Sequence, residues 1–142
     1  MEFGELAFGS PRYAQALDLR YRILRVPLGL EWTEAEIAWE PKERHFALLE
    51  EGQVVAVVVA RDLGAGRCKL RQMAVEPERQ GSGLGRELLD GVDAWLAADE
   101  VKMIELNARD HAVGFYEKQG YRKVGEEFIE VGIPHWKMEK AL

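Results

Sequence analysis

The sequence is nearly devoid of cysteine and has no long apolar run. Cys68 is the only cysteine among 142 residues, which excludes an internal disulfide and a thiolate zinc site. Because Cys68 lies within a strand-like run, we expect it to be a small core residue; a catalytic thiol is the alternative. The three histidines are scattered without metal-ligand spacing, so we expect no metal.

Basic residues are fewer than acidic residues in this sequence. The chain has 19 Lys and Arg against 25 Asp and Glu, for a net charge of −6. This is the wrong sign for a protein whose main task is to bind a phosphate backbone, so we expect no nucleic-acid partner. It mildly favours a cationic substrate such as an amine. The acidic start, residues 1–5, and the lack of a membrane-length apolar run predict a soluble, cytoplasmic protein.

No repeat, low-complexity tract or Pro/Ser-rich linker divides the chain, so we predict a single α+β domain over residues 1–142. The apolar pattern and turn residues predict strands over 3–8, 46–49, 54–59, 68–75 and 103–108, and two more divided at Gly132. We expect the valine run at 54–59 to be a central strand.

Four helices are predicted between these strands. The first begins at Pro11 with Ser10 as its N-cap, and the second carries a Thr33–Glu36 capping box and ends near Pro41. The third is a long amphipathic helix whose apolar face comprises Leu84, Leu88, Leu89, Val92, Trp95 and Leu96. The fourth covers residues 111–119 and ends at Gly120.

The most informative segment is the glycine-rich loop at residues 75–86, which joins a strand to the long helix. Glycines let the backbone approach a ligand closely, and free N–H groups at a helix N-terminus attract phosphate. The loop lacks the Gly-Lys-Ser/Thr of nucleoside triphosphatases. It also misses the dinucleotide fingerprint, because Arg86 stands where a third glycine is needed.

The segment Gln80-Gly81-Ser82-Gly83-Leu84-Gly85 resembles the acetyl-CoA signature of the GNAT acetyltransferase superfamily. Residues 106–108 and the block 112–121, with its Phe115-Tyr116 pair, resemble the family's C-terminal hallmark. The tail 124–138 resembles a subgroup with poorly defined substrates. The resemblance implies the GNAT acyl-CoA N-acyltransferase fold, a mixed central sheet of about six to seven strands flanked by about four helices.

The resemblance also implies the binding residues for acetyl-CoA, the expected co-substrate. The pyrophosphate would lie on the loop N–H groups, and the pantetheine would pair with the strand before the loop, where an N–H of Met73 or Ala74 could polarise the thioester carbonyl. The implied binding residues are Met73, Ala74, Val75, Arg79, Gln80, Gly81, Ser82, Gly83, Leu84, Gly85, Arg86, Asn107 and Phe115.

Family resemblance assigns Tyr116 as the acid that protonates the leaving thiolate. The alternative is a plain core aromatic. A general base must take the proton of the amine, and we prefer His135 because imidazole titrates near neutrality. The other candidates are Glu127, Glu130, Glu31 and Asp110.

Substrate choice is assigned to residues 26–40, where Trp32, Trp39 and several carboxylates could form an aromatic, acidic pocket for a cationic amine; the alternative is that the aromatics bury one face of a short helix. The leading function is transfer of an acetyl group to a primary amine of a small molecule or protein. The alternatives are a non-catalytic acyl-CoA-binding sensor or regulatory module and, on the glycines alone, a nucleotide-binding protein. A homodimer through a C-terminal edge strand is left open.

Overall fold

A computed structural model describes all residues 1–142. It contains seven strands and four α-helices, with four short 3-10 turns between them. The elements follow in the order β1 (Glu2–Leu6), α1 (Pro11–Leu24), η1 (Val26–Leu28), α2 (Glu34–Trp39), η2 (Glu40–Lys42), β2 (Arg44–Glu50), β3 (Gln53–Gly64), β4 (Arg67–Val75), η3 (Pro77–Arg79), α3 (Leu84–Ala98), β5 (Met103–Arg109), η4 (Asp110–Ala112), α4 (Val113–Lys118), β6 (Arg122–Glu130) and β7 (Ile133–Ala141).

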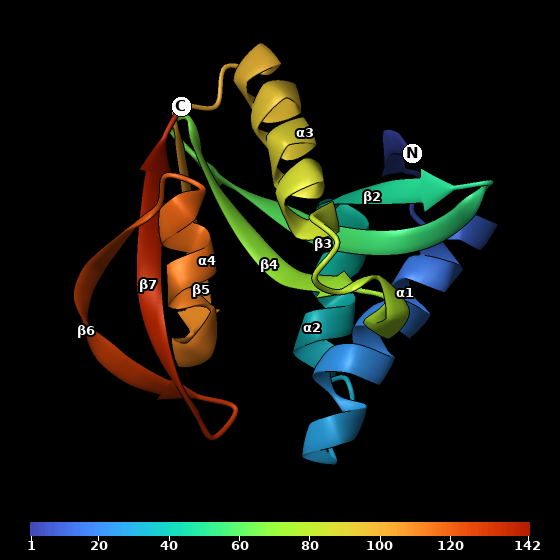
Figure 1. Ribbon diagram of the computed structural model, residues 1–142, viewed down its shortest axis with the longest axis horizontal. Helices are drawn as coiled ribbons and strands as arrows, with labels where there is room; N and C mark the ends of the chain where they lie inside the picture. The colour runs from blue at the N-terminus through green and yellow to red at the C-terminus, as the bar shows by residue number, and fades with distance from the viewer.

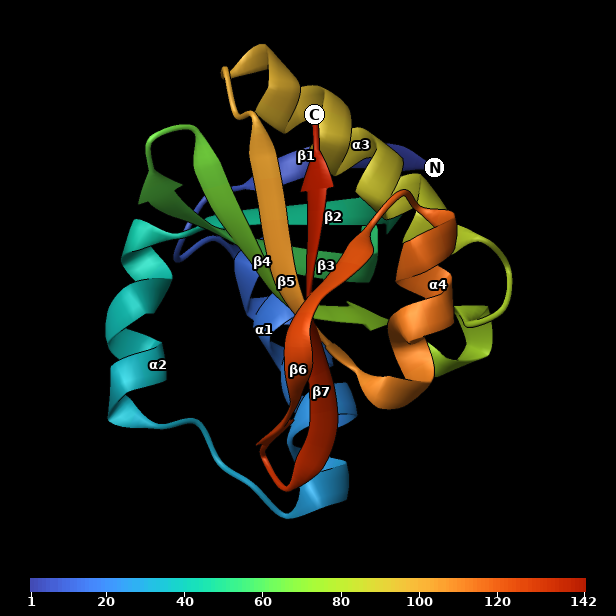
Figure 2. The ribbon, with the colours of Figure 1, turned by 90° about the vertical axis from the view of Figure 1, so that its left-hand side faces the viewer.

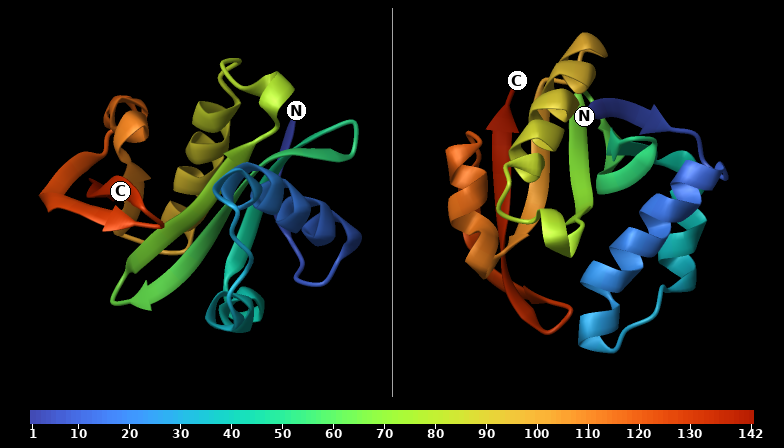
Figure 3. Two further views of the ribbon diagram at one scale, coloured as in Figure 1. Left: turned by 90° about the horizontal axis from the view of Figure 1, so that it is seen from below. Right: turned by 45° about the vertical axis from the view of Figure 1, so that its right-hand side comes forward.

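All strands belong to one mixed sheet in the order β1-β2-β3-β4-β5-β7-β6. Only β4 and β5 are parallel; every other neighbouring pair is antiparallel. Helices α3 and α4 lie on one side of the sheet, and α1 and α2 on the other (Figure 3). The predicted fold class, a mixed sheet of six to seven strands with about four helices, is confirmed.

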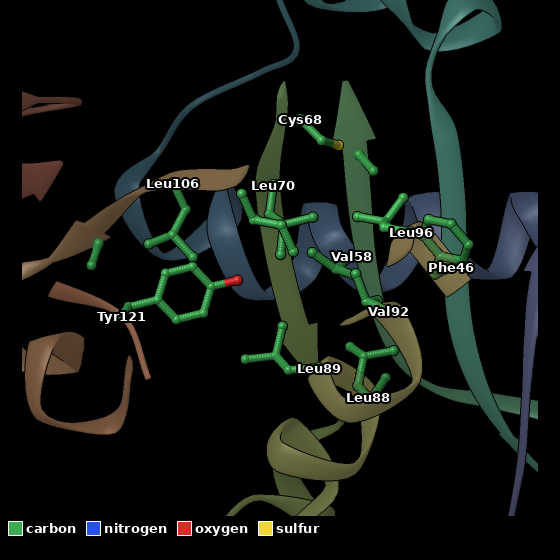
Figure 4. Close-up of a cluster of buried hydrophobic side chains, with 14 of the residues drawn as sticks. Phe46, Val58, Cys68, Leu70, Leu88, Leu89, Val92, Leu96, Leu106 and Tyr121 are labelled. Carbon is green, nitrogen blue, oxygen red and sulfur yellow. The ribbon is translucent and has the colours of Figure 1, made fainter. Parts of the chain in front are cut away.

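The larger core lies between the sheet and α3. Val58 of β3 and Leu70 of β4 meet Leu89 and Val92 of α3, and all four side chains are buried (Figure 4). A smaller cluster packs Ala16 and Leu19 of α1 against the opposite face. Trp95, predicted on the apolar face of α3, is 39% exposed at the rim, where it packs against Phe3 and Phe46.

The helix starts follow the local sequence. Ser10 Oγ accepts the N–H of Tyr13 at 3.1 Å, and both hydrogen bonds of the Thr33–Glu36 capping box are present. The first strand is shorter than predicted, because the chain turns back after Leu6 and leaves Phe8 in that turn, 51% exposed. The predicted helix over 111–119 opens as the 3-10 turn η4 and continues as α4.

The sheet opens between its two parallel strands. Strands β4 and β5 pair only from Arg67–Met103 to Leu70–Leu106. Beyond Leu70, β4 turns away from β5 and β7 (Figure 1). The second half of β4 therefore has no partner on the β5 side, and the opening forms a cleft within the sheet.

Candidate active site

A cleft of about 590 Å³ fills the opening between β4 and β5, a volume typical of small-molecule sites. Its apolar wall comes from the side of α3 and α4, with Met73, Leu89, Phe115 and Tyr116. Its polar wall comes from β4, β5, the end of α1 and the β6–β7 turn. Figure 2 looks onto β5, β6 and β7, with α2 on one side and α4 on the other.

A β-bulge in β4 shapes the cleft. Gln72 has a φ of 53°, and the pairing of β3 with β4 shifts between Val57 and Val59. The Gln72 side chain is fixed by two hydrogen bonds to residues of the helices. Its Oε1 accepts the Nε–H of Arg20 at 2.8 Å, and its Nε2 donates to Glu36 at 3.1 Å. A bulge bends and twists its strand, so these contacts help to turn β4 away from β5.

Arg20 is itself anchored in a buried network. Its guanidinium forms two hydrogen bonds with Glu40, of 2.8 and 2.9 Å, and Glu40 also accepts the Tyr13 hydroxyl at 2.7 Å. Both charged side chains are buried. Burial alone would raise the pKa of Glu40, but the hydrogen bonds and charge of Arg20 outweigh it and hold that pKa below its usual range. The bulge thus rests on a buried ion pair whose charged groups are hydrogen-bonded.

The backbone of β4 presents hydrogen-bonding groups to the cleft. The N–H of Glu76 donates to Val55 of β3, and backbone groups alternate in direction along a strand. The backbone N–H and carbonyl groups of Val75 and Met73 therefore face away from β3, toward the opening. Gln80 Nε2 donates to the Val75 carbonyl at 3.1 Å, which is consistent with a carbonyl that points away from β3. The same alternation turns the N–H of Ala74 toward β3.

The glycine-rich loop leads from β4 into α3 at the edge of this cleft. Gly81 and Gly83 have φ angles of 81° and 85°, which favour glycine, and Gly83 is the N-cap of α3. The N–H groups of Gly81, Gly83, Leu84 and Gly85 donate to no backbone carbonyl. They form the anion-binding end of a helix, which fits a pyrophosphate.

The two arginines beside the loop are placed differently from one another. Arg79 forms an ion pair with Glu50, and the Ser82 hydroxyl donates to the Arg79 carbonyl. The Arg86 side chain is 74% exposed and lies 4.0 Å from Asp90. Neither arginine lines the cleft, and the loop residues 81–85 also lie outside its lining. The other predicted binding residues all line it: Met73, Ala74, Val75, Gln80, Asn107 and Phe115.

Helix α4 brings Phe115 and Tyr116 to the apolar wall, with their rings edge to face at 5.1 Å. Phe115 packs closely against Gly85, where an added Cβ would meet its Cζ at 3.1 Å. Burial raises the pKa of Tyr116 to about 12, so its phenol is protonated at neutral pH. The Tyr116 hydroxyl forms no hydrogen bond within the protein and lines the cleft.

His135 enters the cleft from β7 and is buried. Its Nδ1 lies 2.7 Å from the Ile133 carbonyl, which can only accept, so Nδ1 carries the proton. In the neutral ring Nε2 is then an acceptor, 3.5 Å from Glu130 Oε2. Asn107 Nδ2 donates to the other oxygen of Glu130 at 3.5 Å.

Of the other base candidates, only one lines the cleft. Glu130 lines the cleft, but Glu31 accepts the Tyr21 hydroxyl and Asp110 accepts the Trp136 indole N–H, both outside it. Glu127 also lies outside the cleft lining.

The segment 26–40 contributes little to the cleft. Trp32 lies beneath the guanidinium groups of Arg20 and Arg25, with ring distances of 5.1 and 4.9 Å, and neither Trp32 nor Trp39 lines the cleft. Only Glu36 of this segment does. Trp39 lies against Arg61, whose guanidinium is 4.2 Å from the ring centroid. The expected aromatic, acidic pocket is therefore absent from the cleft, because both indoles stack on arginines.

A family model described as an acetyltransferase (GNAT) domain matches residues 28–142. The chain belongs to the GNAT acetyltransferase family. The resemblance carried by the glycine loop and the Phe115-Tyr116 block is thereby confirmed. No helix of this GNAT protein is long and apolar enough to span a bilayer.

Relatives of this GNAT protein occur in Bacillus subtilis (strain 168). YyaT, an uncharacterized protein, is 30% identical over 99 residues, which are 70% of this chain and 66% of YyaT. YitI, an uncharacterized N-acetyltransferase, is 26% identical over 132 residues, 88% of this chain and 89% of YitI. Another relative from the same organism, BSU40680, is matched over 49% of its length. The chain thus spans half to two thirds of two of these relatives.

Solved structures share the fold. Escherichia coli ElaA has a TM-score of 0.84 at 20% identity over 98% of each chain, and a Pseudomonas aeruginosa acyl-CoA N-acyltransferase has 0.83 at 22% over 99% of each. An aminoglycoside 6'-N-acetyltransferase complexed with coenzyme A has 0.81 at 19% identity, covering 99% of this chain and 97% of its own. At these identities the likeness shows the GNAT fold alone.

Proposed function

We propose that this protein transfers the acetyl group of acetyl-CoA to a primary amine by direct attack in a ternary complex. One observation carries the proposal: the cleft between β4 and β5 is lined by a partly buried phenol and a buried imidazole, and Gln80 at its edge begins the loop whose free N–H groups lead into α3. Acetyl-CoA bound to a GNAT relative from Elizabethkingia anophelis supports the choice of co-substrate.

The free N–H groups of Gly81, Gly83, Leu84 and Gly85 hold the pyrophosphate. The unpaired edge of β4 hydrogen-bonds the pantetheine through Met73 and Val75, and the Met73 N–H polarises the thioester carbonyl. Asn107 and Phe115 line the same cleft and contact the bound pantetheine. Arg79 and Arg86 reach the phosphates only by leaving Glu50 and Asp90.

The amine nitrogen attacks the thioester carbonyl carbon, forming the C–N bond as the C–S bond breaks. His135 Nε2, the free acceptor of the ring, takes the proton from nitrogen, directly or through water. The Tyr116 phenol gives its proton to the departing thiolate, which leaves as CoA thiol. Holding both substrates in contact supplies roughly 7–11 kcal/mol of the barrier in favourable cases.

The test is a two-substrate rate study of thiol release, with mass spectrometry of the N-acetylated product. Lines that intersect in double-reciprocal plots support a ternary complex, and parallel lines contradict it. Tight CoA binding without acetyl transfer to any amine would favour the acyl-CoA-binding sensor over the enzyme.

A further inference from the structure

The polar wall of the cleft is rich in positive charge, although the whole chain carries a net charge of −6. Five cationic side chains and two carboxylates, Glu36 and Glu130, line the cleft. The cations are Arg25, Arg61, Lys69, Arg71 and Arg109. The buried carboxylate of Glu43 pairs with Arg61 and Arg71, and cations still outnumber acids when it is included.

Four of these cations lie on one face of the sheet, and Arg25 caps the end of α1 on the same side. Leu70 of β4, with Leu106 and Ala108 of β5, belongs to the core under α3. Neighbouring residues in a strand point to opposite faces, so Arg71 and Arg109 point to the α1 face. The cationic wall is therefore opposite the apolar wall of Phe115 and Tyr116.

Two of the guanidinium groups keep donors free. Arg71 donates Nε to Glu43 at 3.0 Å, but its Nη2 is buried without a hydrogen-bond partner. The Arg109 side chain is partly buried and forms no ion pair or hydrogen bond within the protein. Burial, and after it the charge of Arg25, lowers the pKa of Arg109. A buried cation without a partner is costly, and an anionic ligand would offset that cost.

The phosphates of CoA do not account for these residues. The loop N–H groups that fit a pyrophosphate follow Val75 at the far end of β4, beside α3. Lys69 and Arg71 lie earlier on the same strand, and Arg109 ends β5 next to His135, its partner in the β5–β7 ladder. The free donors thus lie beside the proposed base, where the amine must bind.

Building on the proposed function, we infer that the acceptor is an amine that also carries an anionic group, a carboxylate or a phosphate, held by Arg71 and Arg109. Guanidinium forks bind both groups bidentately. Binding the anion at the cationic wall places the amino group between His135 and the thioester. A cationic amine, which the net charge of the chain alone favours, is repelled by the same wall.

The experiment compares matched acceptors by thiol release: phosphoethanolamine with ethanolamine, alanine with alaninamide, and spermidine as a polycation. Alaninamide has the less basic amine, so intrinsic reactivity works against the expected result. We expect kcat/KM for phosphoethanolamine or alanine to exceed that of its partner without the anionic group by about tenfold or more. Whether phosphoethanolamine or alanine is preferred distinguishes a phosphate from a carboxylate. A preference for the partners without the anion, or for spermidine, would overturn the inference.

Arg109→Gln removes an unpaired cation and should leave thermal stability intact. It should lower kcat/KM for the anionic acceptor by about 10- to 100-fold, with the KM for acetyl-CoA unchanged. Arg71→Lys, which keeps its charge beside Glu43 but loses the free Nη2 donor, should have a smaller effect of the same kind. The matched control is Arg122→Gln, an exposed arginine on β6 that forms no ion pair, and it should behave as wild type.

A binding measurement separates this inference from the catalytic proposal. Protein saturated with CoA, so that the loop is filled, is titrated with N-acetylalanine and with inorganic phosphate. We expect binding of one of them to wild type and at least tenfold weaker binding to Arg109→Gln. If no amine releases thiol, the proposed function fails and this titration still decides the anion site. Equal binding to both proteins, or none, contradicts the site.

Discussion

His135 donates its Nδ1–H to the carbonyl of Ile133 over 2.7 Å. The bond joins two residues at the start of β7 and fixes both the ring orientation and the tautomer. It leaves Nε2 as the acceptor that faces Glu130 and the cleft. The base proposed for the amine proton is thus oriented by the backbone of its own strand.

Replacing this imidazole tests its role directly. We expect His135→Gln to lower kcat/KM by about 10²–10⁴-fold, the usual contribution of a general base, with little change in the KM for acetyl-CoA. A variant with the wild-type rate would exclude His135.

Tyr116 should act at the leaving group. Tyr116→Phe removes only the hydroxyl, so we expect kcat to fall by about a hundredfold while calorimetry finds unchanged affinity for acetyl-CoA. Tyr21→Phe is the control, since Tyr21 hydrogen-bonds Glu31 outside the cleft and should keep full activity. Equal kcat for wild type and Tyr116→Phe would make Tyr116 a packing residue.

The loop assignment is tested by a matched pair of glycine variants. Gly83 and Gly9 have φ angles of 85° and 80°, and neither has another atom within 4 Å of an added Cβ. Valine should destabilise both positions by about 1–2 kcal/mol through backbone strain. Only Gly83→Val should weaken acetyl-CoA binding, by roughly tenfold or about 1.4 kcal/mol. Equal affinity of the two variants for acetyl-CoA would argue against the loop as the pyrophosphate-binding site.

The Arg20–Glu40 pair predicts a pH dependence of stability. The pKa of Glu40 is lowered in the folded state, so its contribution is complete above the ordinary carboxyl value of 4.5 and is lost as the pH falls below it. Glu40→Gln leaves Arg20 buried without its partner and should cost about 3–5 kcal/mol at neutral pH.

Urea unfolding from about pH 7 to about pH 3 measures this dependence. The difference in the free energy of unfolding between wild type and Glu40→Gln should narrow as the pH falls. A constant difference would mean that the pair adds no pH-dependent stability.

Much of the fold was predictable because its signals are local. Ser10 and the Thr33–Glu36 box mark helix starts through hydrogen bonds within four residues, and the long helix follows from its apolar period. The bulge at Gln72 was not predictable, because no glycine marks it and its support, Arg20, lies far away in the sequence. The short pairing of β4 with β5 is likewise a tertiary property.

The sequence pointed to cleft residues from the loop strand and α4 and to the base candidates His135 and Glu130, but not to the cationic wall. The loop and the Phe115-Tyr116 pair carry a family motif, whereas the cationic wall does not. A weak signal was present: Lys69 and Arg71 alternate with buried Cys68 and Leu70, which places both cations on one face of β4. Lys69 and Arg71 come close to Arg109 and Arg25 only in the folded sheet, so the sequence pattern alone does not predict this cluster.

The most direct test of the account is a calorimetric titration of the purified protein with acetyl-CoA, with ATP and NAD as controls. The account predicts one saturable site for acetyl-CoA, weakened in Gly83→Val, and no site for ATP or NAD. Absence of acetyl-CoA binding, or binding of ATP or NAD in its place, would contradict the assignment of the cleft between β4 and β5.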